Sequence, residues 1–202
     1  MKTTLTFLFV LTLTSIFGQA TIEWSPEYRL QLKDFQSPQT EINPELNSYA
    51  IFSGNNMEFS YQMTNAQFMF TKNFNSKVST VFNRNAAVIT APDSAMAQKL
   101  VKFGQYSFDL TELYSRKFRK KMYENKGVFS DASFFKPIHE ELQEQMNAEL
   151  ARVMKAIDLG QKSELLNEEH QKVLRQIEEM SDFCKECKPP KKKKKRSQSL
   201  YA

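Results

Sequence analysis

The hydrophobic pattern of this 202-residue chain changes its period at residues 91–94, and that change constrains the fold more than any other feature. Before it, short apolar segments include one with strict apolar–polar alternation, as in strands. After it, large residues recur every three or four positions, as in helices. Strands followed by helices are typical of α+β domains. We therefore expect an α+β fold with an antiparallel, β-rich N-terminal half followed by about three helices.

The N-terminal half contains the expected strands. Residues 49–52 and the alternating residues 57–63 flank a turn signal at residues 53–56. Together these segments predict a β-hairpin. Further apolar segments, of which the first is a candidate strand, lie at residues 28–32, 68–70, 78–82 and 88–89.

Three helices are expected after residue 93. Asp93 or Ser94 is a suitable N-cap for the first, a long helix whose last turns, residues 116–121, predict a basic, solvated end. One face of this helix contains Met96, Leu100, Phe103, Ser107, Leu110, Tyr114 and Phe118. The second helix is expected from near Pro137 to Gly160, and the third from near Ser163 to Met180.

Residues 1–20 have the pattern of a cleaved secretory signal peptide. A basic Lys2 precedes an apolar run, and small residues lie at Gly18 and Ala20, so cleavage is expected after Ala20, with Gly18 as the alternative. The run is shorter than the ~20 residues of a membrane span. The expected organisation is a signal peptide over 1–20, one α+β domain over 21–184 and a disordered tail over 185–202, in a periplasmic or extracellular protein.

The net charge of +5 is concentrated in the tail. From residue 185 onward there are eight Lys or Arg residues and one acid, and the densest run comprises Lys191, Lys192, Lys193, Lys194, Lys195 and Arg196. Such a run buries nothing and favours disorder. It is either an inert tail or a segment that binds anionic lipid or envelope polymer, with a gain of ~1 kcal/mol per charge. Nucleic acid is a disfavoured partner, because an exported protein rarely meets it.

Cys184 and Cys187 form a C-x-x-C motif at the expected end of the third helix. An oxidising compartment favours a disulfide, local or intermolecular, for this pair. Free thiols and metal or redox chemistry are the alternatives. Two thiols alone make an incomplete zinc site.

Two stretches carry a resemblance to a known family. The opening Glu23-Trp24-Ser25-Pro26, with Asp34-Phe35, and the central helix are similar to a family of secreted bacterial proteins described as zinc-dependent proteases (domain of unknown function 922). The helix resembles the family's run L-x-x-H-E-Q-x-H-F-D-I-x-E-x-Y-A-R. The matching residues are Leu100, Gln105, Phe108, Asp109, Glu112, Tyr114 and Arg116.

The chain departs from this family at the residues that carry the chemistry. The two helical zinc-binding histidines and the general base correspond to Phe103, Ser107 and Gly104, and the family's last histidine falls near Ser163. None of these is an effective zinc ligand or base. The resemblance therefore implies a degenerate site without catalytic residues, metal or cofactor. The two histidines that the chain does contain, His139 and His170, are interpreted as solvated surface residues.

These observations favour an exported, non-catalytic protein that serves as a binding or structural module in the cell envelope, with an unidentified protein partner and an unspecified oligomeric state. The alternative is an enzyme of another hydrolase class that reuses the cleft around Ser107. Asp109, Glu112 and Arg116 lie at helical spacings. They predict surface ion pairs, with a residual binding groove as the alternative.

Overall fold

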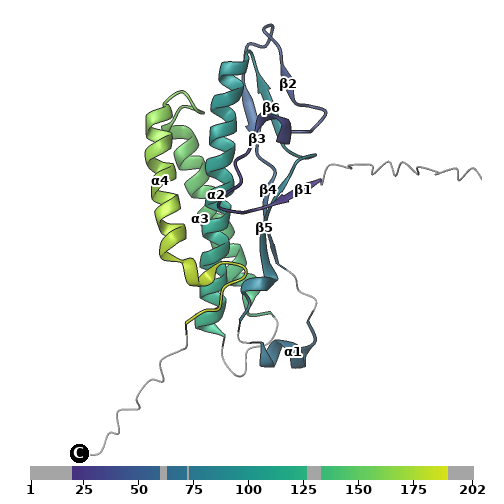
Figure 1. Ribbon diagram of the computed structural model, residues 1–202, viewed down its shortest axis with the longest axis vertical. Helices are drawn as coiled ribbons and strands as arrows, with labels where there is room; N and C mark the ends of the chain where they lie inside the picture. The colour runs from purple at the N-terminus through teal and green to yellow at the C-terminus, as the bar shows by residue number, and fades with distance from the viewer. Residues whose placement is uncertain (1–19, 60–62, 72, 127–132, 191–202) are drawn as a thin grey trace, which may run out of the picture.

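The predicted α+β fold is confirmed by a computed structural model, which describes residues 20–59, 63–71, 73–126 and 133–190 (Figure 1). Short strands come first and three long helices follow. The elements in order are β1 (Thr21–Glu23), η1 (Leu32–Asp34), β2 (Glu41–Ile42), β3 (Ala50–Phe52), β4 (Asn55–Phe59), α1 (Asn65–Phe70), η2 (Asn75–Lys77), β5 (Val78–Asn83), β6 (Val88–Ala91), α2 (Ser94–Asn125), α3 (Phe135–Ala156), α4 (Ser163–Glu179) and η3 (Ser181–Phe183).

The strands form two small sheets, with orders β1-β5-β4 and β2-β6-β3. The predicted hairpin between residues 49–52 and 57–63 is wrong, because β3 pairs with β6 and β4 pairs with β5, both antiparallel. Gly54 lies between β3 and β4 with a φ of +61°, and a Cβ atom there would lie 2.8 Å from the Asn83 carbonyl oxygen. A glycine therefore lets the chain pass from one sheet to the other at this point.

Two other apolar segments of the N-terminal half also differ from expectation. Residues 28–32 form no strand, and the chain enters η1 at Leu32. Residues 68–70 belong to the short helix α1. The Thr64 hydroxyl accepts from the Gln67 amide, while the Gln67 side chain accepts from the Thr64 amide. This reciprocal capping box favours a helical turn over a strand.

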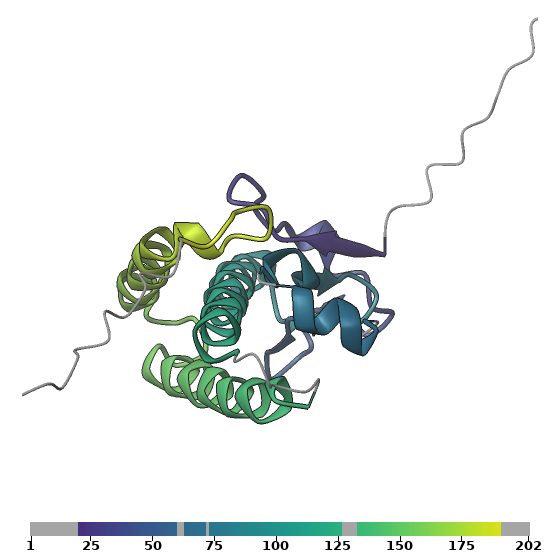
Figure 2. The same ribbon diagram turned by 90° about the horizontal axis from the view of Figure 1, so that it is seen from below.

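Helix α2 is the centre of the molecule. It begins where predicted, with the Asp93 carboxylate accepting a hydrogen bond from the Met96 amide at 2.7 Å. The strands lie on one side of it and α3 and α4 on the other (Figures 1 and 2). It is therefore buried around its circumference over most of its length. A helix of this kind must satisfy its polar side chains inside the protein.

Helices α3 and α4 cover α2 with single apolar faces. The buried residues of these faces are Leu142, Met146, Val153, Leu166, Val173 and Ile177. A tight turn joins the two helices, with left-handed backbone at Asp158, Leu159 and Gly160. Among the described residues, no helix has both the length and the hydropathy of a membrane span.

The folded domain extends past the predicted boundary at residue 184. Lys185 forms an ion pair with Glu23, and the Tyr123 hydroxyl donates to the Pro190 carbonyl. Residues 185–190 are thus held against the domain. The rest of the predicted tail, 191–202, and residues 1–19 of the predicted signal peptide lie outside the described residues.

Candidate functional site

The three α2 positions that the resemblance aligned with zinc-binding residues and a base, Phe103, Gly104 and Ser107, are buried. Phe103 is only 2% exposed and stacks on Tyr106, with ring centroids 6.0 Å apart. A Cβ atom on Gly104 would lie 2.9 Å from Phe35 Cζ and 3.4 Å from Ile51 Cδ1. The glycine therefore allows a phenyl ring to pack directly against the α2 backbone, which is a packing role.

Ser107 also lies in the packed interface between helix and strands. It is 3% exposed, and its hydroxyl lies 3.1 Å from the Ser53 hydroxyl and 2.8 Å from the Asn55 side-chain amide. Among the hydrogen bonds of the described residues, none joins Ser107 to a histidine. The expected cleft around Ser107 is therefore filled. Ser163 begins α4 and has no described hydrogen bond to these α2 residues.

Asp109 accepts three side-chain hydrogen bonds inside the protein. Trp24 Nε1 donates to Oδ1 at 2.7 Å, Gln105 Nε2 donates to Oδ2 at 3.0 Å, and His170 Nε2 lies 2.6 Å from Oδ2. Asp109 is buried and His170 is mostly covered. Their interpretation as surface residues is therefore wrong. The other histidine, His139, is half-buried with its ring edge-on to Phe118.

Glu112 is the second buried carboxylate of α2, one helical turn further along. It accepts from Thr80 Oγ1 at 2.8 Å, Arg116 Nε at 2.8 Å and Arg119 Nη1 at 2.9 Å. The Thr80 and Ser115 hydroxyls share a further hydrogen bond of 2.7 Å. The predicted solvated basic end is wrong for the two arginines, since both are buried and paired.

The same two arginines hold the C-terminal segment onto α2. Arg116 Nη1 donates to the Ile177 carbonyl at 2.8 Å, and Arg119 Nη1 donates to the Phe183 carbonyl at 3.0 Å. Arg119 Nη2 donates to the Val78 carbonyl of β5 at 2.8 Å. One carboxylate and several carbonyl oxygens thus share the two positive charges.

The chain beyond η3 forms a loop closed by a disulfide between Cys184 and Cys187. The side-chain amides of Asn73 and Asn75 both donate to the Cys187 carbonyl at 3.0 Å. This disulfide loop is therefore attached to the segment that precedes β5.

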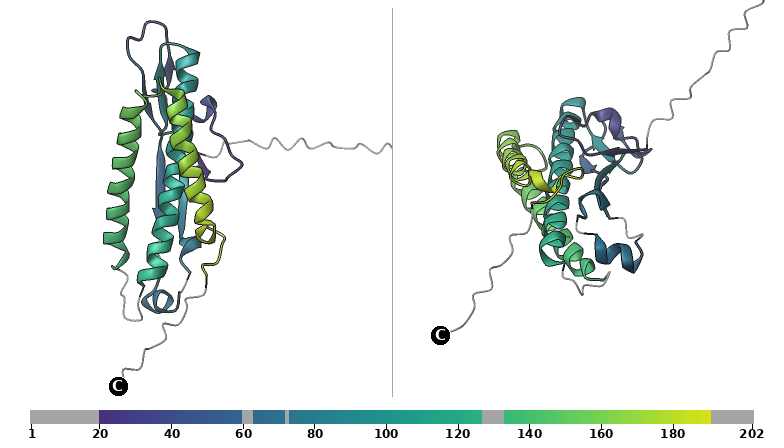
Figure 3. Two further views of the ribbon diagram at one scale, coloured as in Figure 1. Left: turned by 90° about the vertical axis from the view of Figure 1, so that its left-hand side faces the viewer. Right: turned by 60° about the horizontal axis from the view of Figure 1, so that its bottom comes forward.

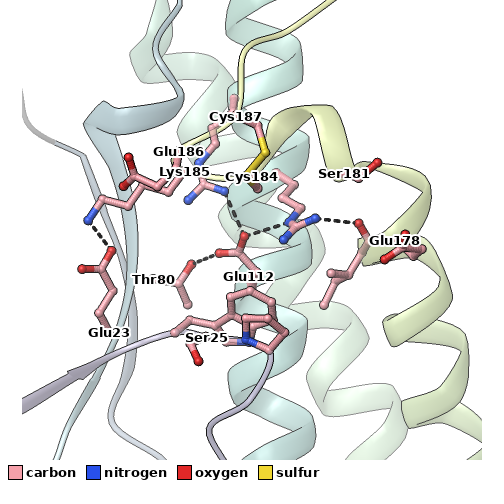
Figure 4. Close-up of a pocket in the computed structure, with 15 residues that line it drawn as sticks. Glu23, Ser25, Thr80, Glu112, Glu178, Ser181, Cys184, Lys185, Glu186 and Cys187 are labelled. Atoms are coloured by element: carbon pink, nitrogen blue, oxygen red, sulfur yellow. Dashed lines mark hydrogen bonds and ion pairs between the residues drawn. A yellow bond between two sulfur atoms is a disulfide. The ribbon is translucent and has the colours of Figure 1, made fainter.

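A cavity of about 620 Å³ lies between the N-terminal segment, α2 and the disulfide loop (Figure 4). The Arg116 guanidinium lies 5.4 Å from the centre of the Trp24 ring. The pair Glu112–Arg116 and the disulfide contribute to the walls. The lining residues are Glu23, Trp24, Ser25, Pro26, Thr80, Glu112, Arg116, Arg119, Ile177, Glu178, Ser181, Cys184, Lys185, Glu186 and Cys187. Of these, the sequence analysis had singled out Cys184 and Cys187, and the resemblance had included Glu23, Trp24, Ser25, Pro26, Glu112 and Arg116.

A smaller cavity of about 360 Å³ lies among α2, α3 and α4. Lys117 Nζ lies 4.0 Å from the centre of the Tyr114 ring, and burial lowers the pKa of Lys117. Hydrogen bonds from Lys172 and Arg152 lower the pKa of the Glu169 carboxyl. The polar walls of this cavity are therefore internally paired.

Among the described residues, no group of three or more His, Cys, Asp or Glu side chains gathers closely enough to hold a metal ion. Asp109, Glu112, Arg116 and Arg119 of α2 are instead paired with one another and with groups from neighbouring segments. What the arrangement offers is a preformed cavity with a polar inner wall.

We predict that Gly104→Ala lowers the free energy of unfolding by about 1 kcal/mol, because the overpacking cost exceeds the gain in helix propensity. Urea unfolding measures the change. In a Phe35→Leu background, which removes the ring contact, the same substitution should cost less. A Gly104→Ala variant as stable as the parent would contradict the packing role.

Glu112→Gln is expected to destabilise the fold by about 3 kcal/mol, because it leaves two buried guanidiniums without a carboxylate. Glu178→Gln removes an exposed carboxylate from the same cavity and should change the stability by less than about 0.5 kcal/mol. Thermal or urea unfolding of both variants tests this difference. If both variants changed the free energy of unfolding equally, the buried pairing of Glu112 would contribute no more to stability than an exposed carboxylate.

The chain matches no protein-family model, no curated protein and no solved structure in comparisons with known proteins.

Proposed function

We propose that this chain is an exported, non-catalytic binding module of the cell envelope that takes its ligand in the cavity beside Trp24. The observation that carries the proposal is the paired polar wall of α2 facing a preformed cavity of about 620 Å³. Ligand sites in proteins are usually clefts of about 300–1,000 Å³ with mostly apolar walls and a few placed polar groups.

The packing of the degenerate positions supports a non-catalytic role. Phe103 and Gly104 pack in the core. The Ser107 hydroxyl forms hydrogen bonds with the side chains of Ser53 and Asn55. A nucleophilic serine needs a base within hydrogen-bonding reach and access to substrate. The hydrolase alternative therefore has little geometric support.

The cavity wall indicates the chemistry of the ligand. The charges of Glu112, Arg116 and Arg119 are already paired with one another or with carbonyl oxygens. The exposed carboxylates of Glu178 and Glu186 remain at the rim, while the Trp24 ring supplies an apolar surface. We infer a small molecule or short peptide with a cationic group beside an apolar one.

The polybasic run of residues 191–196 supports an envelope location. Six adjacent cations attract anionic lipid or polymer at ~1 kcal/mol per charge near a surface. The signal-peptide pattern of residues 1–20 and the Cys184–Cys187 disulfide agree with an oxidising, extracytoplasmic compartment.

The absence of zinc chemistry can be tested on the purified mature protein. Elemental analysis should find less than stoichiometric zinc, and added zinc should not induce hydrolysis of casein or ester substrates. One tightly held zinc per chain, or zinc-dependent cleavage, would refute the non-catalytic assignment.

Trp24 is the only tryptophan of the chain and lines the cavity, so its fluorescence reports binding there. A library of short peptides that carry a lysine beside an aliphatic residue is expected to change its emission. Ser181→Tyr, which adds a large side chain at the cavity wall, should abolish the response. Ser94→Tyr, at the exposed start of α2, is the matched control and should retain it. A response that survives Ser181→Tyr would place binding elsewhere.

A further inference from the structure

Two adjacent apolar side chains project from α1 into solvent. Met69 is 57% exposed and Phe70 is 81% exposed, the largest value among the exposed large apolar residues described. A single exposed apolar residue is ordinary. Two neighbours at the tip of a molecule are a feature of surfaces that enter a membrane interface.

The rest of α1 is anchored, so the pair is held outward. Phe68 is buried, with its ring 5.8 Å from that of Phe74 and 5.7 Å from that of Phe134. Lys126 Nζ donates to the Met69 carbonyl at 3.0 Å and the Thr71 carbonyl at 2.6 Å. Phe68 packs into the core, and Lys126 holds the backbone of α1 in place. Met69 and Phe70 are therefore directed outward.

The last described residue, Pro190, lies at this same end of the molecule. Tyr123, in the last turn of α2, donates to the Pro190 carbonyl, and Lys126 follows the helix and contacts α1. Both α1 and the C-terminal end of the described chain lie at the lower end of the molecule in Figure 1 and in the left panel of Figure 3. The six cations of residues 191–196 begin directly after Pro190.

We propose that this end of the molecule docks on an anionic lipid bilayer, with Met69 and Phe70 inserted at the boundary between the lipid headgroups and the acyl chains. The inference rests on the proposed envelope function, in which the polybasic run is attracted to an anionic surface. The exposed pair distinguishes between the two anionic surfaces considered, a lipid bilayer and a wall polymer. A wall polymer offers charge but no apolar phase, whereas a bilayer accommodates both the cations and the exposed pair.

The first test uses the mature protein and sedimentation with vesicles of phosphatidylcholine, with or without phosphatidylglycerol. Binding should require the anionic lipid, and Phe70→Ser should weaken it about tenfold because the inserted ring is lost. Phe52→Ser is the matched control, since Phe52 is 62% exposed on β3, away from α1, and its loss should leave binding unchanged. Equal partitioning of the parent and Phe70→Ser proteins would overturn the proposal.

A second measurement separates insertion from simple charge attraction. The Phe70→Trp variant contains a second tryptophan besides Trp24, and its contribution is the difference between the spectra of variant and parent. This contribution should shift to the blue on anionic vesicles and should be quenched by lipids brominated on the acyl chain. Phe52→Trp should show neither change. If the protein binds vesicles without quenching at position 70, insertion is refuted and the charge-driven function survives.

Replacing residues 191–196 by glutamine tests the underlying function separately. Loss of vesicle binding in this variant supports the role of the charged run. If the variant still bound vesicles and this binding still depended on Phe70, the role of the charged run would be refuted, whereas the insertion of Met69 and Phe70 would stand. A parent protein that binds anionic wall polymer but no vesicle would overturn the bilayer proposal.

Discussion

The structure depends on the internal pairing of charged side chains along α2. This helix is enclosed by two sheets and two helices, so Asp109, Glu112 and the two arginines are largely removed from water. A buried charge without a partner costs several kcal/mol. Each carboxylate therefore takes three side-chain partners, and each arginine also reaches backbone carbonyls.

This pairing organises parts of the chain that are far apart in sequence. Trp24, from the N-terminal segment, and His170, from α4, meet at Asp109. The carbonyls of Ile177 and Phe183 are held by arginines of α2. The cavity exists because these segments are fixed around one helix (Figure 4), so the stability of the network and the shape of the proposed ligand site share one cause.

The longer elements were predictable because their signals are local. The Asp93 cap and the three- and four-residue periods identified α2, α3 and α4, and the apolar segments near residues 78–82 and 88–89 became β5 and β6. The hairpin was not predictable, because a turn signal at Gly54 does not say which strand lies alongside. Pairing with β5 and β6 was decided by contacts across the sheets. In α1, the capping box outweighed the apolar run.

The sequence by itself determined the α+β order and the concentration of charge after residue 190, and it has Phe103, Gly104 and Ser107 at the positions where the family that it resembles has histidines and a base. Only the tertiary structure decided that Asp109 and its neighbours are buried, that a cavity adjoins them and that α1 lies at the same end of the molecule as the last described residues. Helical period and residue type are local properties. Burial is not, because it depends on partners such as Trp24 and Asp109, 85 residues apart, which only the folded chain brings together.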